Sequence, residues 1–331
     1  MVPPAWNVFR QPLSLAVLLV SLLGAAAPRS RAELKTPVWI QDASGGSASV
    51  TGTEKFHAWI GGKPARVQSV HPPDGNLILL VVMDVVNDMV RVDAARTALI
   101  QAFEKFKSSQ FVALLRAQDG LQVLVEPTGD RESVKDSLLN LPVTGFPGLL
   151  ESIEDAAAIG DKMLRASDVR VAVLYITDGS IYEYRGDYTN PVINPSDGGD
   201  LSRRFRDRLI QERMKRTMGV VISSWTPLFF LHLESRRDQL NMVYQNGLTQ
   251  FAGLTAGDAL FCESLSQVPA YLDQLIDKVR GFHLLSIETP PELGGRVRLR
   301  LEVDGYPEIQ YREQFEIAKV KVEGTKKKGR K

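Results

Sequence analysis

The centre of the chain alternates between short, continuous apolar runs and longer segments with apolar residues at helical spacing. Residues 77–83 form one such run, Leu-Ile-Leu-Leu-Val-Val-Met, and it ends at Asp84. An uninterrupted run of this length is typical of a strand that is buried on both faces of a sheet. From Met89 the apolar residues recur three or four positions apart, which is the spacing of an amphipathic helix. The pattern therefore predicts a buried strand followed by a helix.

The same alternation continues as far as residue 281. It predicts further strands at residues 111–115, 121–125, 169–177, 218–223 and 259–261. It predicts further helices at residues 149–165, 201–217, 240–254 and 268–279. The apolar run 225–231 is interpreted as core or edge-strand packing. Strands that alternate with helices predict an α/β fold, with a doubly wound, mostly parallel sheet that carries helices on both faces.

Both flanks of this region have the two-residue alternation of strands. Residues 56–60 and 65–70 are separated by Gly61-Gly62, which predicts a β-hairpin. Residues 296–303 alternate strictly, and a turn leads them into residues 309–315. We therefore predict a small flanking β subdomain from both termini, paired as one small sheet. The predicted organisation is an N-terminal β segment (33–74), an α/β domain (75–281), a C-terminal β-hairpin segment (282–318) and a basic disordered tail (319–331).

The N-terminal residues follow the order of features that is typical of a secretory signal peptide. Arg10 precedes an apolar run from Leu13 to Ala27, and small residues follow as far as Ala32. The run is shorter than the roughly 20 residues that a spanning helix needs. We expect residues 1–32 to be removed by cleavage after Ala32 or earlier in the alanine run; an uncleaved anchor is the alternative. The mature protein is then secreted or periplasmic, and no later stretch is long and apolar enough to span a membrane.

Composition narrows the possible functions. The 331 residues contain 40 Lys and Arg against 39 Asp and Glu, a net charge of +1, so no strong field favours nucleic acid as a partner. The one cysteine, Cys262, excludes an internal disulfide and a multi-cysteine metal site. The sequence also lacks a Gly-x-Ser-x-Gly elbow, a Walker-type glycine loop and a dinucleotide-binding fingerprint. These absences favour a protein that is not an enzyme.

Two aspartates stand where predicted central strands end. Asp84 follows the strand at 77–83, and Asp178 follows the strand at 169–177. Ligands of open parallel sheets bind beyond the carboxyl ends of the strands, because loops and helix N-termini converge there. Asp88, four residues after Asp84, lies at the predicted start of a helix. We expect the three carboxylates to lie at one edge of the sheet.

The order of several short segments resembles the von Willebrand factor type A domain, and more closely the secreted acidobacterial proteins related to it. The resemblance covers about residues 35–318. It rests on the Gly-Gly-Lys-Pro hairpin and on Val81-Val82-Met83-Asp84, Ile176-Thr177-Asp178-Gly179, residues 248–257 and residues 295–305. It implies a type A α/β domain that follows a β segment and precedes a β-hairpin.

The resemblance also implies a metal-ion-dependent adhesion site. That site uses Asp-x-Ser-x-Ser, a threonine from a second loop and the aspartate of Thr-Asp-Gly to hold Mg²⁺, Mn²⁺ or Ca²⁺. Asp84 and Asp178 match it, Asp88 replaces the second serine, Val86 replaces the first, and Pro147 stands near the threonine position. Asp84, Asp88 and Asp178 are therefore the candidate ligands of a degenerate site. In the alternative interpretation, Asp88 or its neighbour caps the helix, backbone N–H groups of that helix satisfy Asp84, and Asp178 ends a strand in a turn.

A loop that follows Asp178 is the candidate surface for partner binding. Tyrosine-bearing loops on a rigid scaffold are common recognition surfaces. Its candidate contact residues are Tyr182, Tyr184, Tyr188, Asn190, Asn194 and Asp197.

We therefore predict a secreted, non-catalytic protein that binds a protein, extracellular-matrix or cell-envelope partner at the carboxyl-end edge of the sheet. One alternative is a metal-independent scaffold. Another is a phosphohydrolase with Asp84 as nucleophile, although Val86 stands where such an enzyme has its second aspartate. The sequence does not indicate an oligomeric state.

Overall fold

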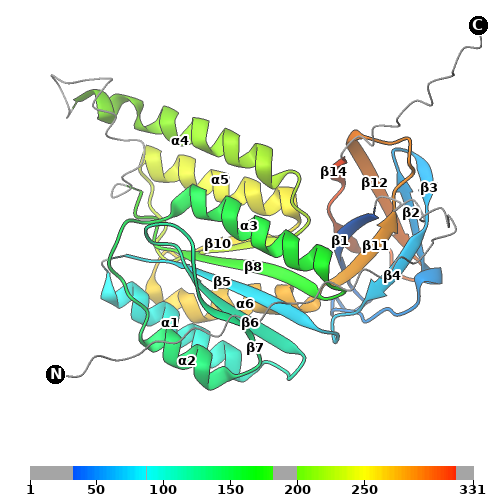
Figure 1. The fold of residues 1–331 in the computed structure, drawn as a ribbon, viewed down its shortest axis with the longest axis horizontal. Coiled ribbons are helices and arrows are strands. Elements are labelled where there is room, and N and C mark those ends of the chain that lie inside the picture. Colours follow the sequence, from blue (N-terminus) through cyan, green and yellow to red (C-terminus); the bar gives the residue numbers. More distant parts are fainter. Residues whose placement is uncertain (1–32, 87, 182–199, 318–331) are drawn as a thin grey trace, which may run out of the picture. The chain divides into compact units, whose positions relative to one another are not determined.

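The computed structural model describes residues 33–86, 88–181 and 200–317. Within these ranges the strands form a six-stranded central sheet and two four-stranded small sheets (Figure 1). The strands are β1 (Glu33–Ile40), β2 (Phe56–Ile60), β3 (Lys63–Ala65), β4 (Val67–His71), β5 (Leu77–Asp84), β6 (Gln110–Arg116), β7 (Gln122–Thr128), β8 (Arg170–Thr177), β9 (Leu228–His232), β10 (Asp258–Phe261), β11 (His283–Glu288), β12 (Gly295–Val303), β13 (Ile309–Tyr311) and β14 (Gln314–Ile317). The helices are α1 (Met89–Glu104), α2 (Arg131–Leu139), α3 (Leu149–Ala166), α4 (Asp200–Val221), α5 (Gln239–Thr255) and α6 (Val268–Gly281).

The central sheet has the order β10-β9-β8-β5-β6-β7. Neighbouring strands are parallel except β6 and β7, which are antiparallel. Helices α3, α4 and α5 cover one face, and α1, α2 and α6 cover the other (Figure 1). The prediction of a doubly wound, mostly parallel sheet is confirmed. In the described part of the chain, no helix combines the length and the apolar character that crossing a bilayer requires.

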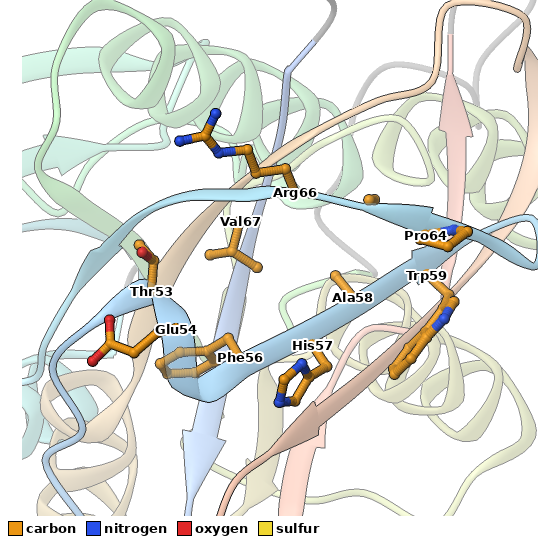
Figure 2. A pocket seen from close by; sticks show the side chains of 10 residues that line it. Thr53, Glu54, Phe56, His57, Ala58, Trp59, Pro64, Arg66 and Val67 are labelled. Atoms are coloured by element: carbon orange, nitrogen blue, oxygen red, sulfur yellow. The ribbon is translucent and has the colours of Figure 1, made fainter.

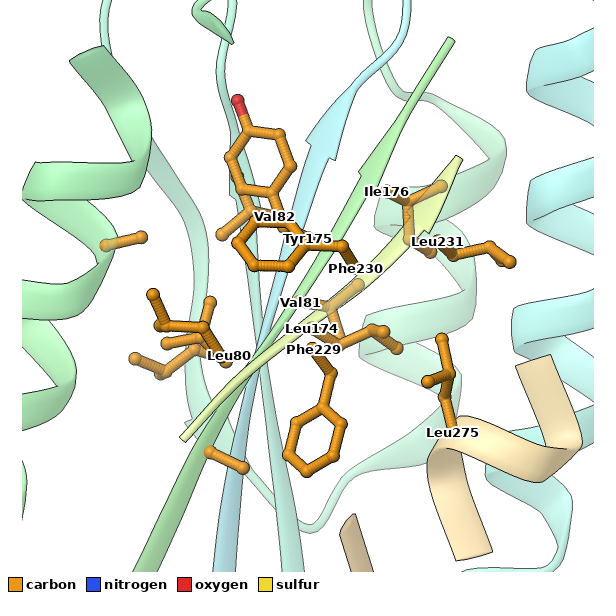
Figure 3. Close-up of a cluster of buried hydrophobic side chains, with 14 of the residues drawn as sticks. Leu80, Val81, Val82, Leu174, Tyr175, Ile176, Phe229, Phe230, Leu231 and Leu275 are labelled. Atoms are coloured by element: carbon orange, nitrogen blue, oxygen red, sulfur yellow. The ribbon is translucent and has the colours of Figure 1, made fainter. Parts of the chain in front are cut away.

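Side chains of the central strands alternate between the two helical layers (Figure 3). Tyr175 and Phe230 lie on one face, with ring centroids 6.0 Å apart. Ile176 and Leu231 lie on the other face, on the side of Leu275 from α6 (Figure 3). All five are buried. Because both faces of these strands meet helices, neighbouring positions can all be apolar, and this explains the uninterrupted runs in the sequence.

The strand predicted at 218–223 is wrong, because α4 continues as far as Val221. Ile210, Met214 and Val221 are all buried, so Val221 extends the buried stripe of the helix. The next strand is β9, and all of its residues are buried between β8 and β10. The run 225–231 therefore contains an interior strand. A short apolar run fits either a strand or the end of a helix, and periodicity does not separate the two.

The flanking strands form two small sheets instead of the predicted single sheet. Their orders are β13-β1-β11-β4 and β14-β12-β2-β3, so each sheet combines strands from both flanks. In β12 the alternation buries Val297, Leu299 and Leu301 on one face of its sheet. Those side chains join one core with Leu34 and Ile287 of the other sheet. A sheet that is apolar on one face needs a second layer, and the other small sheet supplies it.

Arg170 anchors the chain segments that connect the central sheet to the small sheets. It is the first residue of β8, and its side chain is fully buried. Nη1 donates to the carbonyls of Arg280 (2.9 Å) and Phe282 (3.1 Å), and Nη2 donates to those of Pro73 (2.5 Å) and Gly75 (2.9 Å). Burial lowers the pKa of the guanidinium to about 10, so it stays charged at neutral pH. The Arg170 side chain thus joins the segment that enters the central sheet before β5 to the segment that leaves it after α6.

Two more buried cations from the small-sheet region bind the ends of helices. Lys35 of β1 donates from Nζ to the carbonyls of Leu164 (3.0 Å) and Ser167 (3.2 Å) at the end of α3. Arg312 donates to the carbonyls of Ile222 and Ser224, just after α4. Cations at helix C-termini satisfy free carbonyls and oppose the negative end of the helix dipole. These contacts attach the small sheets to the amino end of the central sheet.

Candidate functional site

The opposite, carboxyl end of the central sheet carries the sequence-predicted site. We define the rim as the described residues at and beyond the ends of β5, β6, β8 and β9 together with the segment that precedes α3, namely residues 84–86, 88, 117–121, 141–148, 178–181 and 233–238. Backbone and side-chain hydrogen bonds join these segments. For example, Asp119 N donates to the Phe146 carbonyl (3.0 Å), and Gln118 Nε2 donates to the Val85 carbonyl (2.7 Å).

Asp84 lies at the centre of the rim and is fully buried. Its Oδ1 accepts from Gly148 N (2.9 Å), and its Oδ2 accepts from Tyr175 Oη (2.9 Å) and Thr177 Oγ1 (3.4 Å). Gly148 is required there, because a Cβ would lie 2.3 Å from the Ala117 carbonyl oxygen. The carboxylate therefore ties the segment before α3 to strands β5 and β8.

Asp178 is the neighbour of Asp84, as expected from the ends of the two strands. Its backbone N–H donates to the Asp84 carbonyl (3.3 Å). Its Oδ2 accepts from Val86 N (3.3 Å), and its Oδ1 accepts from Ser180 N (3.1 Å) and Ser180 Oγ (2.7 Å). Burial raises the pKa of this carboxyl, while these hydrogen bonds and the charge of Arg91 oppose the rise.

Asp88 is the N-cap of α1. Its Oδ1 accepts from Val90 N (3.1 Å) and Arg91 N (3.2 Å), and its Oδ2 lies 3.2 Å from Arg91 Nε. The capping role matches the alternative interpretation of the sequence for this residue. Asp84, in contrast, accepts hydrogen bonds from Gly148 N and from side chains of β8.

The described side chains of the rim do not form the ligand set of a divalent cation. Among the described residues, no group of three His, Cys, Asp or Glu side chains is placed to hold a metal ion. The carboxylate oxygens of Asp84 and Asp178 face N–H and O–H donors, which a cation would have to displace. The side chains of Val86 and Pro147 offer no oxygen ligand.

Sequence reasoning missed several residues that shape the rim. Tyr175 is the clearest: its phenol donates to Asp84, and burial raises its pKa well above the usual value. A usable signal existed, because residues 175 and 177 share one face of a strand and Thr177 pairs with Asp84 in register. His232 gave no such signal. Its buried ring lies under Gly179, where a Cβ would come within 2.3 Å of Nε2, and burial lowers its pKa to about 3.

The predicted partner-binding residues lie outside the described part of the chain. This applies to Tyr182, Tyr184, Tyr188, Asn190, Asn194 and Asp197.

Exposed apolar side chains lie on the rim and beside it. Met89 and Val90 begin α1, and Phe146 precedes α3. Val90 is 68% exposed and Phe146 is 41% exposed. Apolar side chains grouped near the ligand-binding end of an α/β sheet are typical of a contact surface.

A separate hollow of about 350 Å³ lies on the β2–β3 hairpin of a small sheet (Figure 2). Its lining includes Glu54, His57, Trp59 and Arg66. It forms where Arg66 and Val67 lead the chain from β3 in one small sheet to β4 in the other. The hollow contains none of the sequence-predicted site residues.

No family model and no curated protein matches this sequence. Solved structures with a similar fold include a von Willebrand factor type A protein from Catenulispora acidiphila, with 11% identity, a TM-score of 0.43, and coverage of 88% of this chain and 74% of that one. The PilB minor pilin from Streptococcus sanguinis has 10% identity, a TM-score of 0.45, and coverage of 65% and 63%. Proximal thread matrix protein 1 from the mussel byssus, whose MIDAS motif is occupied by zinc, has 10% identity, a TM-score of 0.39, and coverage of 61% and 47%. The central sheet of the described residues is an α/β sheet with one antiparallel edge strand, β7.

Proposed function

We propose that this chain is an exported, non-catalytic type A protein that binds a protein partner of the cell envelope or extracellular matrix through its rim. The observation that carries the proposal is the exposure of Met89, Val90 and Phe146 at the carboxyl end of the sheet. The amino end is engaged by the small sheets through Lys35 and Arg170. The rim and the start of α1 thus present exposed apolar side chains at the carboxyl end of the sheet.

The burial of Asp84 supports a non-catalytic role. A phosphohydrolase nucleophile must reach the phosphorus atom of its substrate, whereas both oxygens of Asp84 are inside the protein and accept from Gly148 and Tyr175. The neighbouring Val86 offers no general acid.

Substitution of the exposed apolar side chains tests the binding role. Val90→Asp and Phe146→Asp are each expected to reduce capture of a specific envelope protein by about tenfold or more, because a charge replaces a desolvated apolar contact. Capture from an envelope extract of the source cells is quantified by mass spectrometry. Val220→Asp is the matched control, since Val220 is exposed at the far end of α4. Equal capture by wild type and by both variants would favour the scaffold alternative.

Export predicts a defined mature N-terminus. We expect mass spectrometry of the protein recovered from outside the cytoplasm to give Glu33 as the first residue, after cleavage at Ala32. Cleavage beyond Leu34 would remove a buried side chain of β1, which pairs with β11 from Glu33 to Val38. Recovery of the chain with residues 1–32 attached would contradict this prediction and indicate an anchor.

A further inference from the structure

A positively charged side chain of α1 connects two segments of the rim. The side chain of Arg91 is only 16% exposed. Its Nε lies 3.2 Å from Asp88 Oδ2, just after β5, and its Nη2 contacts Glu234 Oε2, just after β9. Arg236 also contacts this Glu234 oxygen, with Nη2 at 3.1 Å. Two guanidinium groups and two carboxylates thus form a network across the rim.

Arg91 also acts on the third rim segment. Its charge favours the ionised form of Asp178, which follows β8. The positive charge is therefore felt by Asp88, Glu234 and Asp178, which come from three different strand ends. A divalent cation in an adhesion site would play the same electrostatic part, since it would relieve repulsion between carboxylates of neighbouring loops.

We propose that Arg91 supplies the positive charge that a divalent cation supplies in an adhesion site, so that the rim is held together without a metal. A guanidinium group forms directional hydrogen bonds with carboxylates. The Gly148 N–H and the Tyr175 hydroxyl donate hydrogen bonds to the Asp84 oxygens that a cation would need. These two donors therefore take the place of a cation at Asp84, as Arg91 does at the other carboxylates. This inference concerns the stability of the rim and does not depend on which partner binds there.

Thermal unfolding with and without cations tests the proposal. The midpoint of the wild-type protein is expected to stay within about 1 °C in EDTA or in millimolar Mn²⁺, Mg²⁺ or Ca²⁺. Arg91→Ser is expected to lower it by about 3 °C or more. Millimolar Mn²⁺ or Ca²⁺ should restore at least half of that loss, because the variant removes the Arg91 charge from beside Asp88, Glu234 and Asp178, while Arg236 still pairs with Glu234. The unfolding midpoint of Arg91→Lys should lie between those of Arg91→Ser and the wild type, and it should not change when cations are added.

Arg298→Ser is the matched control. Arg298 forms an exposed ion pair with Glu313 on a small sheet, so its loss removes the same kind of group away from the rim. Three outcomes would overturn the proposal. The first is a wild-type midpoint that rises with Mn²⁺ and loses this response in Asp178→Asn. The second is an Arg91→Ser midpoint equal to that of the control. The third is an Arg91→Ser protein that is destabilised but gains nothing from any of the cations.

Discussion

Replacement of Arg170 by methionine is expected to lower the free energy of unfolding by about 4 kcal/mol. The guanidinium is fully buried and donates to carbonyls of Pro73, Gly75, Arg280 and Phe282. Methionine fills similar volume but donates no hydrogen bond, so these carbonyls lose a charged donor. Because whole proteins are stable by only about 5–15 kcal/mol, the loss is a large share of the total.

Urea denaturation with linear extrapolation measures this effect. Arg298→Met is the matched control, and its exposed ion pair with Glu313 predicts a change below about 1 kcal/mol. Arg170→Lys keeps the charge but has fewer donors, so its stability should lie between wild type and Arg170→Met. If Arg170→Met is as stable as the control, the hydrogen bonds of Arg170 to the segments at 73–75 and 280–282 do not stabilise the fold.

Acidification from pH 7.5 to pH 4.5 is expected to remove about 5 kcal/mol of stability through two buried histidines. Burial lowers the pKa of His232 to about 3 and that of His283 to about 4, whereas the usual value is 6.5. Below pH 6.5 the unfolded chain binds protons at both sites and the folded chain does not. Stability therefore falls as pH falls from 6.5 toward the folded pKa values.

His283→Gln separates this titration from packing. Glutamine can still accept the hydrogen bond that Val50 N donates to His283 Nε2 (2.9 Å), but it does not titrate. The loss of stability between pH 7.5 and 4.5 should shrink by about 2.5 kcal/mol in this variant. Above pH 7.5 the histidine titration contributes nothing, so the difference from wild type there measures packing alone. An unchanged slope between pH 6.5 and 4.5 would show that His283 takes up its proton in the folded state.

The hydrophobic pattern was sufficient to place most elements of the central sheet. The runs before Asp84 and Asp178 predicted β5 and β8, and the two aspartates are neighbours because parallel adjacent strands end at the same edge. The pattern missed α2, in which only Val134 and Leu138 are buried, because two apolar side chains make too weak a stripe. It also placed a strand at 218–223 instead of the end of α4.

The role of each candidate site residue depended on partners distant in the sequence. An aspartate before a helix has the same local sequence whether it caps the helix or binds a metal, so Asp88 was ambiguous. Asp84 is held by Gly148, 64 residues away, and by Tyr175, 91 residues away. Such pairings arise only when the strands and loops have packed.

The sequence by itself determined most of the strands and helices of the central α/β domain, because burial periodicity is a local property of the chain. The tertiary structure decided that the flanks form two sheets, that Lys35, Arg170 and Arg312 bind carbonyls of distant segments, and that Arg91 lies among the rim carboxylates. A buried polar group must find a partner wherever the fold brings one near, and this requirement acts across the whole chain.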